Sequence, residues 1–234
     1  MTRSLRTDRW CYRELVEAGA EKKLIRTTAL RVEALLKRLL LPVLLATAWL
    51  LVLSPACAAP ADEADFKPLF NGKDFDGWRF SLQKAGDPWP DNWKVKDGVI
   101  SLTGGRRPHL VTLKEFTDFE LRFEWRALQE KYNSGCYVRT IKDAANNQIN
   151  LQKGSEGAMV GIKWPGSKPV PELQKKVGEW NEWFVRVVGD KLTLTCNGKL
   201  AWEATGFKPA SGWIGLQAEE AAMEFRNLRL RELK

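Results

Sequence analysis

The chain has 234 residues, a formal net charge of +8 and a single histidine, a length that allows one large domain or two small ones. One histidine excludes a multi-histidine metal site. The sequence contains no internal repeat and no low-complexity tract, which argues against a solenoid or a disordered protein.

The first 58 residues have the features of a targeting segment and not of a folded unit. They hold ten basic and five acidic side chains, followed by an uncharged apolar run over 39–53 and an Ala56-Cys57-Ala58 cleavage pattern. That run is shorter than the roughly 20 residues of a membrane-spanning helix. We therefore predict a basic region and signal peptide over 1–58, a linker over 59–65 and a globular domain over 66–234. An uncleaved membrane anchor and lipid attachment at Cys57 are the alternatives.

The charge of the predicted mature part is small. Five of the eight net positive charges belong to residues 1–58, and the remaining basic and acidic side chains are interleaved. The sequence has no basic stripe of the kind that is typical of nucleic-acid binding. We expect an exported protein, periplasmic or extracellular, without a nucleic-acid partner and without stable membrane insertion after cleavage; the sequence leaves its oligomeric state open.

Short alternating segments follow one another along the predicted domain. Residues 93–96 and 99–102 flank an Asp97-Gly98 turn and predict a hairpin. Residues 118–126 alternate strictly between apolar and polar side chains, which indicates a strand with one buried face. Further strands are predicted over 136–140, 148–152, 183–188, 192–196, 200–202, 213–217 and 223–230.

This pattern predicts an all-β fold. About ten short strands, frequent turns and no sustained helical period favour a two-sheet antiparallel sandwich of the jelly-roll type. Residues 154–178 have no clear period and are expected to form loops at the rim.

Seven motifs follow one another along the predicted domain. They are LFNGKDFDGW, WKVKDGVI, DFELRFEWR, NSGCYVR, GEWNEWFVRVVGDKLTLTCNGKL, GWIGLQ and EFRNLRLREL. In this order they resemble the bacterial 3-keto-disaccharide hydrolase domain family, and the resemblance covers nearly everything from Phe66 to the C-terminus. The resemblance implies a concanavalin A-like jelly roll, export, and activity on glycosides, particularly sugars oxidised at carbon 3. A ketone there acidifies the carbon 2 proton, so the leaving group can depart by elimination and water can add back; this requires a general acid or base and donors to an enolate oxygen.

Strand alternation supplies candidate residues for such a site. If Phe123 and Trp125 face the core, Glu124 points outward, and by the same reasoning Tyr137, Arg139, Gln148 and Asn150 point away from the core. If the strands are neighbours, these side chains share one sheet surface, which in jelly rolls is often concave and binds sugar. We therefore predict Glu124 as the acid or base and Arg139 as the group that contacts an oxyanion or a hydroxyl of the substrate. The alternative is that Glu124 and Arg139 form an exposed cross-strand ion pair. Glu120 and Arg122 are expected to be solvated.

Gln148 departs from the resemblance, because many relatives have a carboxylate at this position. An amide orients a sugar but cannot accept a proton, so the loop residue Glu156 is a candidate replacement. We predict that Gln148 and Glu156 bind substrate, together with Tyr137 and Asn150.

The tryptophans, the single histidine and two cysteines are the remaining residues of interest in the predicted domain. Trp89 and Trp164 lie in proline-flanked loop sequence and are candidates for stacking on sugar, whereas those in predicted strands (Trp78, Trp93, Trp125, Trp183 and Trp213) are expected in the core. His109 is interpreted as a packed or surface residue. Cys136 and Cys196 have core-facing parity and are either a disulfide or two buried thiols.

The resulting hypothesis is an exported enzyme that cleaves 3-keto-glycosides by hydrolysis or elimination. Its predicted partner is a small carbohydrate, and no cofactor is predicted. No residues are predicted as metal ligands, the sequence leaves a metal requirement open, and a structural calcium has no supporting motif. Because Gln148 is not a carboxylate, a non-catalytic carbohydrate-binding module using the same face is the alternative. A third reading, an envelope interaction protein, rests on the possible anchor.

Overall fold

The computed structural model describes residues 63–82, 87–141, 146–160 and 167–234. Residues from Asp62 to Lys234 form one compact unit. The predicted signal peptide lies outside the described residues. Within the described ranges, no helix is both long and apolar enough to cross a lipid bilayer.

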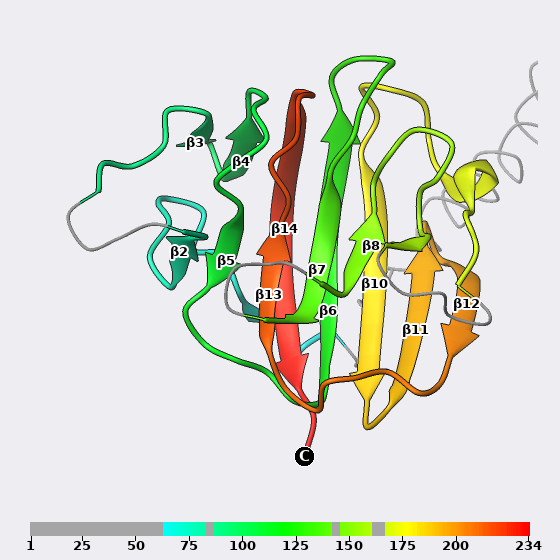
Figure 1. Cartoon of the computed structure of the whole chain (residues 1–234). Helices are drawn as coiled ribbons and strands as arrows, with labels where there is room; N and C mark the ends of the chain where they lie inside the picture. Colours follow the sequence, from blue (N-terminus) through cyan, green and yellow to red (C-terminus); the bar gives the residue numbers. More distant parts are fainter. Residues whose placement is uncertain (1–62, 83–86, 142–145, 161–166) are drawn as a thin grey trace, which may run out of the picture. The chain divides into compact units, whose positions relative to one another are not determined.

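Two antiparallel sheets build the domain and face each other as the two layers of a sandwich (Figure 1). Sheet A contains, in spatial order, β12 (Lys199–Ala204), β11 (Lys191–Cys196), β10 (Asn181–Val188), β6 (Phe119–Ala127), β14 (Met223–Glu232), β4 (Val99–Leu102) and β3 (Trp93–Lys96), with β1 (Lys67–Pro68) also paired to β14. Sheet B contains β2 (Trp78–Phe80), β5 (Leu110–Thr112), β13 (Trp213–Leu216), β7 (Gly135–Thr140), β8 (Gln148–Asn150) and β9 (Met159–Val160). The predicted all-β jelly-roll sandwich is confirmed.

The turns follow the predicted chemistry. Asp97 and Gly98 have φ angles of 51° and 78°, and Asn197 and Gly198 have 50° and 77°. Positive φ at both central residues is the geometry that matches the twist of a two-residue hairpin. The segment 154–178, expected as loops, also contains β9 and a short 3₁₀ helix over Pro171–Leu173.

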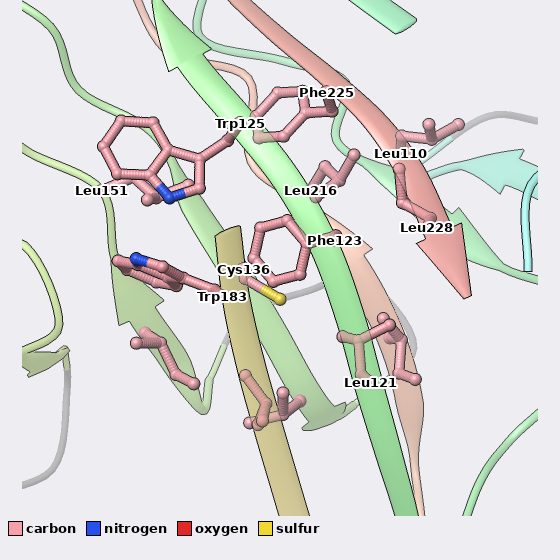
Figure 2. Close-up of a cluster of buried hydrophobic side chains, with 14 of the residues drawn as sticks. Leu110, Leu121, Phe123, Trp125, Cys136, Leu151, Trp183, Leu216, Phe225 and Leu228 are labelled. Atoms are coloured by element: carbon pink, nitrogen blue, oxygen red, sulfur yellow. The ribbon is translucent and has the colours of Figure 1, made fainter. Parts of the chain in front are cut away.

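Alternating apolar side chains from both sheets fill the space between the layers. Figure 2 shows Phe123 and Trp125 of β6 together with Trp183 of β10 in this core. The Trp125 and Trp183 rings meet edge to face, with centroids 5.6 Å apart. Cys136 and Cys196 are buried here as free thiols, so of the two alternatives the unpaired one holds.

Candidate functional site

The outer face of sheet B gathers three of the predicted substrate-binding residues. Tyr137 of β7 pairs with Gln148 of β8, and Gly135 pairs with Asn150 two residues further along the same strands. Since Cys136 and Ile149 point into the core, Tyr137, Gln148 and Asn150 all point to the opposite side. The expectation that they share a surface is confirmed.

Two glycines leave room for long side chains to lie across this face. A Cβ at Gly135 would sit 2.2 Å from Nε2 of Gln148, so Gln148 occupies the space above that glycine. A Cβ at Gly215 of β13 would lie 3.4 Å from the Tyr137 ring and 2.9 Å from a backbone oxygen. Glycine is thus required at both positions for close approach.

Gln148 begins a chain of polar contacts that runs to a carboxylate. Its Nε2 donates to Oε1 of Gln217 at 2.7 Å, and Nε2 of Gln217 donates to Oε1 of Glu219 at 3.3 Å. Gln217 also hydrogen-bonds to the hydroxyl of Tyr137. We call Tyr137, Gln148, Gln217 and Glu219 the polar cluster.

The hydroxyl of Tyr137 is held in its protonated form. Burial and the nearby charge of Glu219 raise its pKa to about 12, although the positive charge of Arg107 and the hydrogen bond from Gln217 act in the opposite direction. A phenol that keeps its proton throughout the physiological range is a hydrogen-bond donor for a ligand oxygen. Glu219, with a side chain 21% exposed, is the carboxylate in the cluster.

An apolar surface adjoins the polar cluster. Val111 of β5 packs against Tyr137, and Trp213 packs against both. The guanidinium of Arg79 lies 5.5 Å from the centre of the Trp213 ring. The expectation that Trp213 belongs to the core between the sheets is wrong, because its partly exposed ring lies on the outer face. An aromatic ring beside amides and a carboxylate is an arrangement that suits a sugar, which has both C–H faces and hydroxyl groups.

Comparison with known proteins gives this fold a family. The sequence profile of the 3-keto-alpha-glucoside-1,2-lyase-like domain matches residues 65–231. The chain belongs to this family. A 3-keto-disaccharide hydrolase from Bacteroides thetaiotaomicron is 30% identical over 102 residues, which cover 38% of this chain and 34% of that protein. The alignment thus spans about a third of the length of the curated relative.

Solved structures show the same sandwich. A proposed glycosyl hydrolase from Parabacteroides distasonis superimposes with a TM-score of 0.56 at 20% identity, covering 74% of this chain and 96% of that one. The carbohydrate-binding module CBM66 from Bacillus subtilis gives a TM-score of 0.51 at 14% identity, covering 67% and 96%. The chain therefore has the two-sheet sandwich fold of these structures and belongs to the 3-keto-alpha-glucoside-1,2-lyase-like family.

In this family member Arg139 does not join the other predicted site residues, contrary to expectation. Its φ angle is +44°, and the register between β13 and β7 shifts at this point, which interrupts the inward–outward alternation. The fully buried guanidinium donates to Asp118 at 2.7 Å and to the carbonyls of Thr117 at 2.7 Å and Gly189 at 2.6 Å. Arg139 therefore connects the segment that contains Thr117 and Asp118 with the turn at Gly189.

Glu124 has the predicted outward direction but lies on the other sheet. β6 is a strand of sheet A and β7 a strand of sheet B, so the expected shared surface of Glu124 and Arg139 is wrong. The carboxylate accepts from Arg226 at 2.7 Å and from Asn227, and it borders an open hollow of about 500 Å³. A catalytic role for Glu124 stays a prediction, and the cross-strand ion pair that it forms is with Arg226 and not with Arg139.

Glu120 and Arg122 of β6 belong to the same ion-paired surface as Glu124. Glu120 is only 2% exposed and pairs with Arg186 and Arg231, so the expectation that it is solvated is wrong. Arg122 lies over the rings of Phe66 and Phe184, at 5.3 and 4.6 Å.

Glu156 is enclosed and does not reach the outer face. It is 1% exposed and accepts a hydrogen bond from the hydroxyl of Tyr132, whose ring packs against Trp125 in the core. The expectation that a loop carboxylate replaces the one missing at Gln148 is therefore wrong for Glu156.

Of the two loop tryptophans, only Trp89 lies within the described residues. Trp89 is 57% exposed, and its ring stacks on Phe75 at 5.8 Å and meets Phe80 edge-on at 5.1 Å. Its role in sugar stacking stays a prediction. Trp164 lies outside the described residues.

Gln217 and Glu219 are the residues that sequence reasoning missed. They continue the parity of Trp213 and Gly215, so alternation would have placed them on the outer face if Trp213 had been assigned there. Assigning Trp213 to the core inverted the phase of β13. Among the described residues, no three His, Cys, Asp or Glu side chains gather as metal ligands.

Proposed function

We propose that this protein cleaves 3-keto-glycosides on the outer face of sheet B, with Glu219 as the base. The observation that supports this proposal is the polar cluster, in which a carboxylate, a protonated phenol and two amides are joined by hydrogen bonds beside Trp213. Membership of the 3-keto-alpha-glucoside-1,2-lyase-like family supports the same substrate class.

The chemistry balances with water as the sole co-reactant. Glu219 accepts the proton from carbon 2, the electron pair forms a carbon 1–carbon 2 double bond, and the bond from carbon 1 to the glycosidic oxygen breaks. The departing oxygen takes up a proton, which Glu219 can return. Addition of water across the new double bond then yields the 3-keto sugar, so elimination and hydration together amount to hydrolysis.

Each other member of the cluster has a role suited to its charge. The Tyr137 hydroxyl donates to the carbon 3 oxygen, which becomes negative as the carbon 2 proton leaves. Gln148 orients a sugar hydroxyl through its Oε1, because its Nε2 donates to Gln217 and to the carbonyl of Ser134. Gln217 is a positioning residue, since its amide already contacts Gln148, Glu219 and Tyr137. Trp213 offers its ring to the C–H face of the sugar.

The test is turnover of 3-keto-trehalose and a 3-keto-glucoside by the full-length protein, followed as release of free sugar. Glu219→Gln should lower kcat by about 10²–10⁴-fold, the contribution of a positioned base. Glu220→Gln is the matched control, because both carboxylates lie within ion-pair distance of Arg106, at 3.8 Å for Glu219 and 2.9 Å for Glu220, but Glu220 is 72% exposed and Glu219 only 21%. In D₂O, elimination followed by hydration should place deuterium on carbon 2 of the product.

Full activity in Glu219→Gln would overturn the assignment of the base. Binding of the sugar by the unmodified protein without any turnover would instead favour a carbohydrate-binding module, a function whose known example CBM66 has the same sandwich. Export is part of the proposal, and N-terminal sequencing of the protein from the envelope fraction should find cleavage after Ala58.

A further inference from the structure

His109 lies on the outer face of sheet B, beside the polar cluster. Gly215 pairs with Val111 and Leu216 with Leu110, so the next pair in this register is Gln217 and His109. Val111 points outward and Leu110 inward, which gives His109 the outward direction. Its ring centre is 5.4 Å from that of Tyr137.

Backbone contacts fix the position of this histidine. Its N–H donates to Oγ of Ser81 at 3.0 Å, and its carbonyl accepts from the N–H of Ser81 at 2.8 Å. Ser81 is fully buried, so both bonds are shielded from water. The imidazole therefore has little freedom to move relative to Tyr137.

One ring nitrogen is already occupied by the fold. Nδ1 accepts a hydrogen bond from the backbone N–H of Ala218 at 3.0 Å. An acceptor nitrogen carries no proton, so the neutral ring has its proton on Nε2. Protonating Nδ1 would place two N–H donors against each other. Nε2 has no hydrogen-bond partner within the described part of the chain.

The surroundings disfavour a charged ring as well. Burial and the positive charge of Arg107 lower the pKa of His109 to about 4. Tyr137, whose ring contacts His109, stays protonated. The negative charge of Glu219 acts on Tyr137, and Glu219 itself lies 3.8 Å from Nε of Arg106. At neutral pH the ring is thus uncharged.

We propose that His109 is a neutral hydrogen-bond donor, which presents its Nε2–H to an oxygen of the substrate. The proposal rests on the proposed function for the identity of the substrate. With its proton on Nε2 and its Nδ1 lone pair engaged, the ring cannot act as the base, and this separates its role from that of Glu219. The carbon 3 oxygen, where negative charge develops, is the acceptor that benefits most from a fixed neutral donor.

Nuclear magnetic resonance tests the proton position directly, because the full-length chain has only one histidine. Long-range ¹H–¹⁵N spectra of protein labelled at histidine should show the Nε2–H tautomer from pH 8 to pH 5. Adding a 3-keto-glucoside should shift the Nε2–H signal. An Nδ1–H tautomer, a charged ring at pH 6, or a signal unaffected by saturating ligand would each overturn the proposal.

Two variants separate donation from packing. His109→Gln places an amide N–H near the position of Nε2 and should keep at least a tenth of kcat, whereas His109→Met should lose about 10²–10³-fold, the effect of removing one such donor. Thermal unfolding of both variants controls for folding. Equal losses in two folded variants would contradict the donor role.

The two proposals fail in different ways. If the protein binds 3-keto-glucoside and the Nε2–H signal shifts but no product forms, the cleavage proposal fails and the donor proposal stands. If product forms, but the Nε2–H signal does not shift and His109→Gln and His109→Met lose activity equally, the cleavage proposal stands and the donor proposal fails. The pH profile of kcat/KM should contain no step near the ordinary histidine pKa of about 6.5.

Discussion

The side chain of Gln148 lies directly over Gly135, close enough that a Cβ at Gly135 would be 2.2 Å from Nε2. In this position Gln148 reaches across β7 to Gln217 of the next segment. A glycine on one strand thus determines where an amide from the neighbouring strand can hydrogen-bond.

Gly135→Ala should therefore displace Gln148 and weaken sugar binding by about tenfold or more. The backbone of Gly135 is not in the positive-φ region, so the added methyl group conflicts with the side chain of Gln148 and not with the local conformation. The measurement is a double-mutant cycle of Gly135→Ala and Gln148→Ala. If Gly135→Ala weakens binding as much without Gln148 as with it, the steric explanation is wrong.

Glu124→Gln should leave turnover within about twofold of the unmodified enzyme. Its carboxylate is bonded to Arg226 and Asn227 on sheet A, away from the polar cluster. Losing a partly exposed ion pair should lower the free energy of unfolding by about 0.2–1 kcal/mol, measured by urea denaturation. A large loss of turnover with retained stability would instead support the catalytic role that the sequence predicts for Glu124.

Arg139→Met should destabilise the fold by about 3 kcal/mol or more, because it leaves Asp118 and several loop carbonyls without their donor. Thermal and urea unfolding measure this loss. The fraction that remains folded at low temperature should retain its kcat. Asp118→Asn, which keeps an oxygen acceptor at the more exposed end of the pair, should cost less.

The free energy of unfolding should fall as the pH is lowered from about 6.5 to 4, because of the shifted pKa of His109. Its pKa is about 4 in the folded protein and about 6.5 when exposed, so in this window the unfolded chain binds a proton that the folded chain does not. Above pH 6.5 both states are neutral and the contribution vanishes. The decrease approaches about 3 kcal/mol at pH 4. Urea unfolding at pH 7 and pH 4.5 should reveal it, and His109→Gln should remove that part of the pH dependence.

The amino-acid sequence was sufficient for the fold class and for most side-chain directions. Alternation along 118–126 and at Tyr137, Gln148 and Asn150 depends only on neighbouring residues, because successive side chains of a strand point to opposite faces. The Asp97-Gly98 and Asn197-Gly198 turns are equally local, since both require positive φ.

Tertiary structure decided which faces meet. β6 and β7 follow each other in the chain but lie in different sheets, so the correct outward direction of Glu124 could not show that Arg139 was elsewhere. The left-handed backbone at Arg139 and the outward position of Trp213 both depend on pairing across strands. Alternation along a strand is a local property, whereas the choice of neighbouring strands is made by contacts between residues far apart in the chain, and this choice brought Glu219 and His109 to Tyr137.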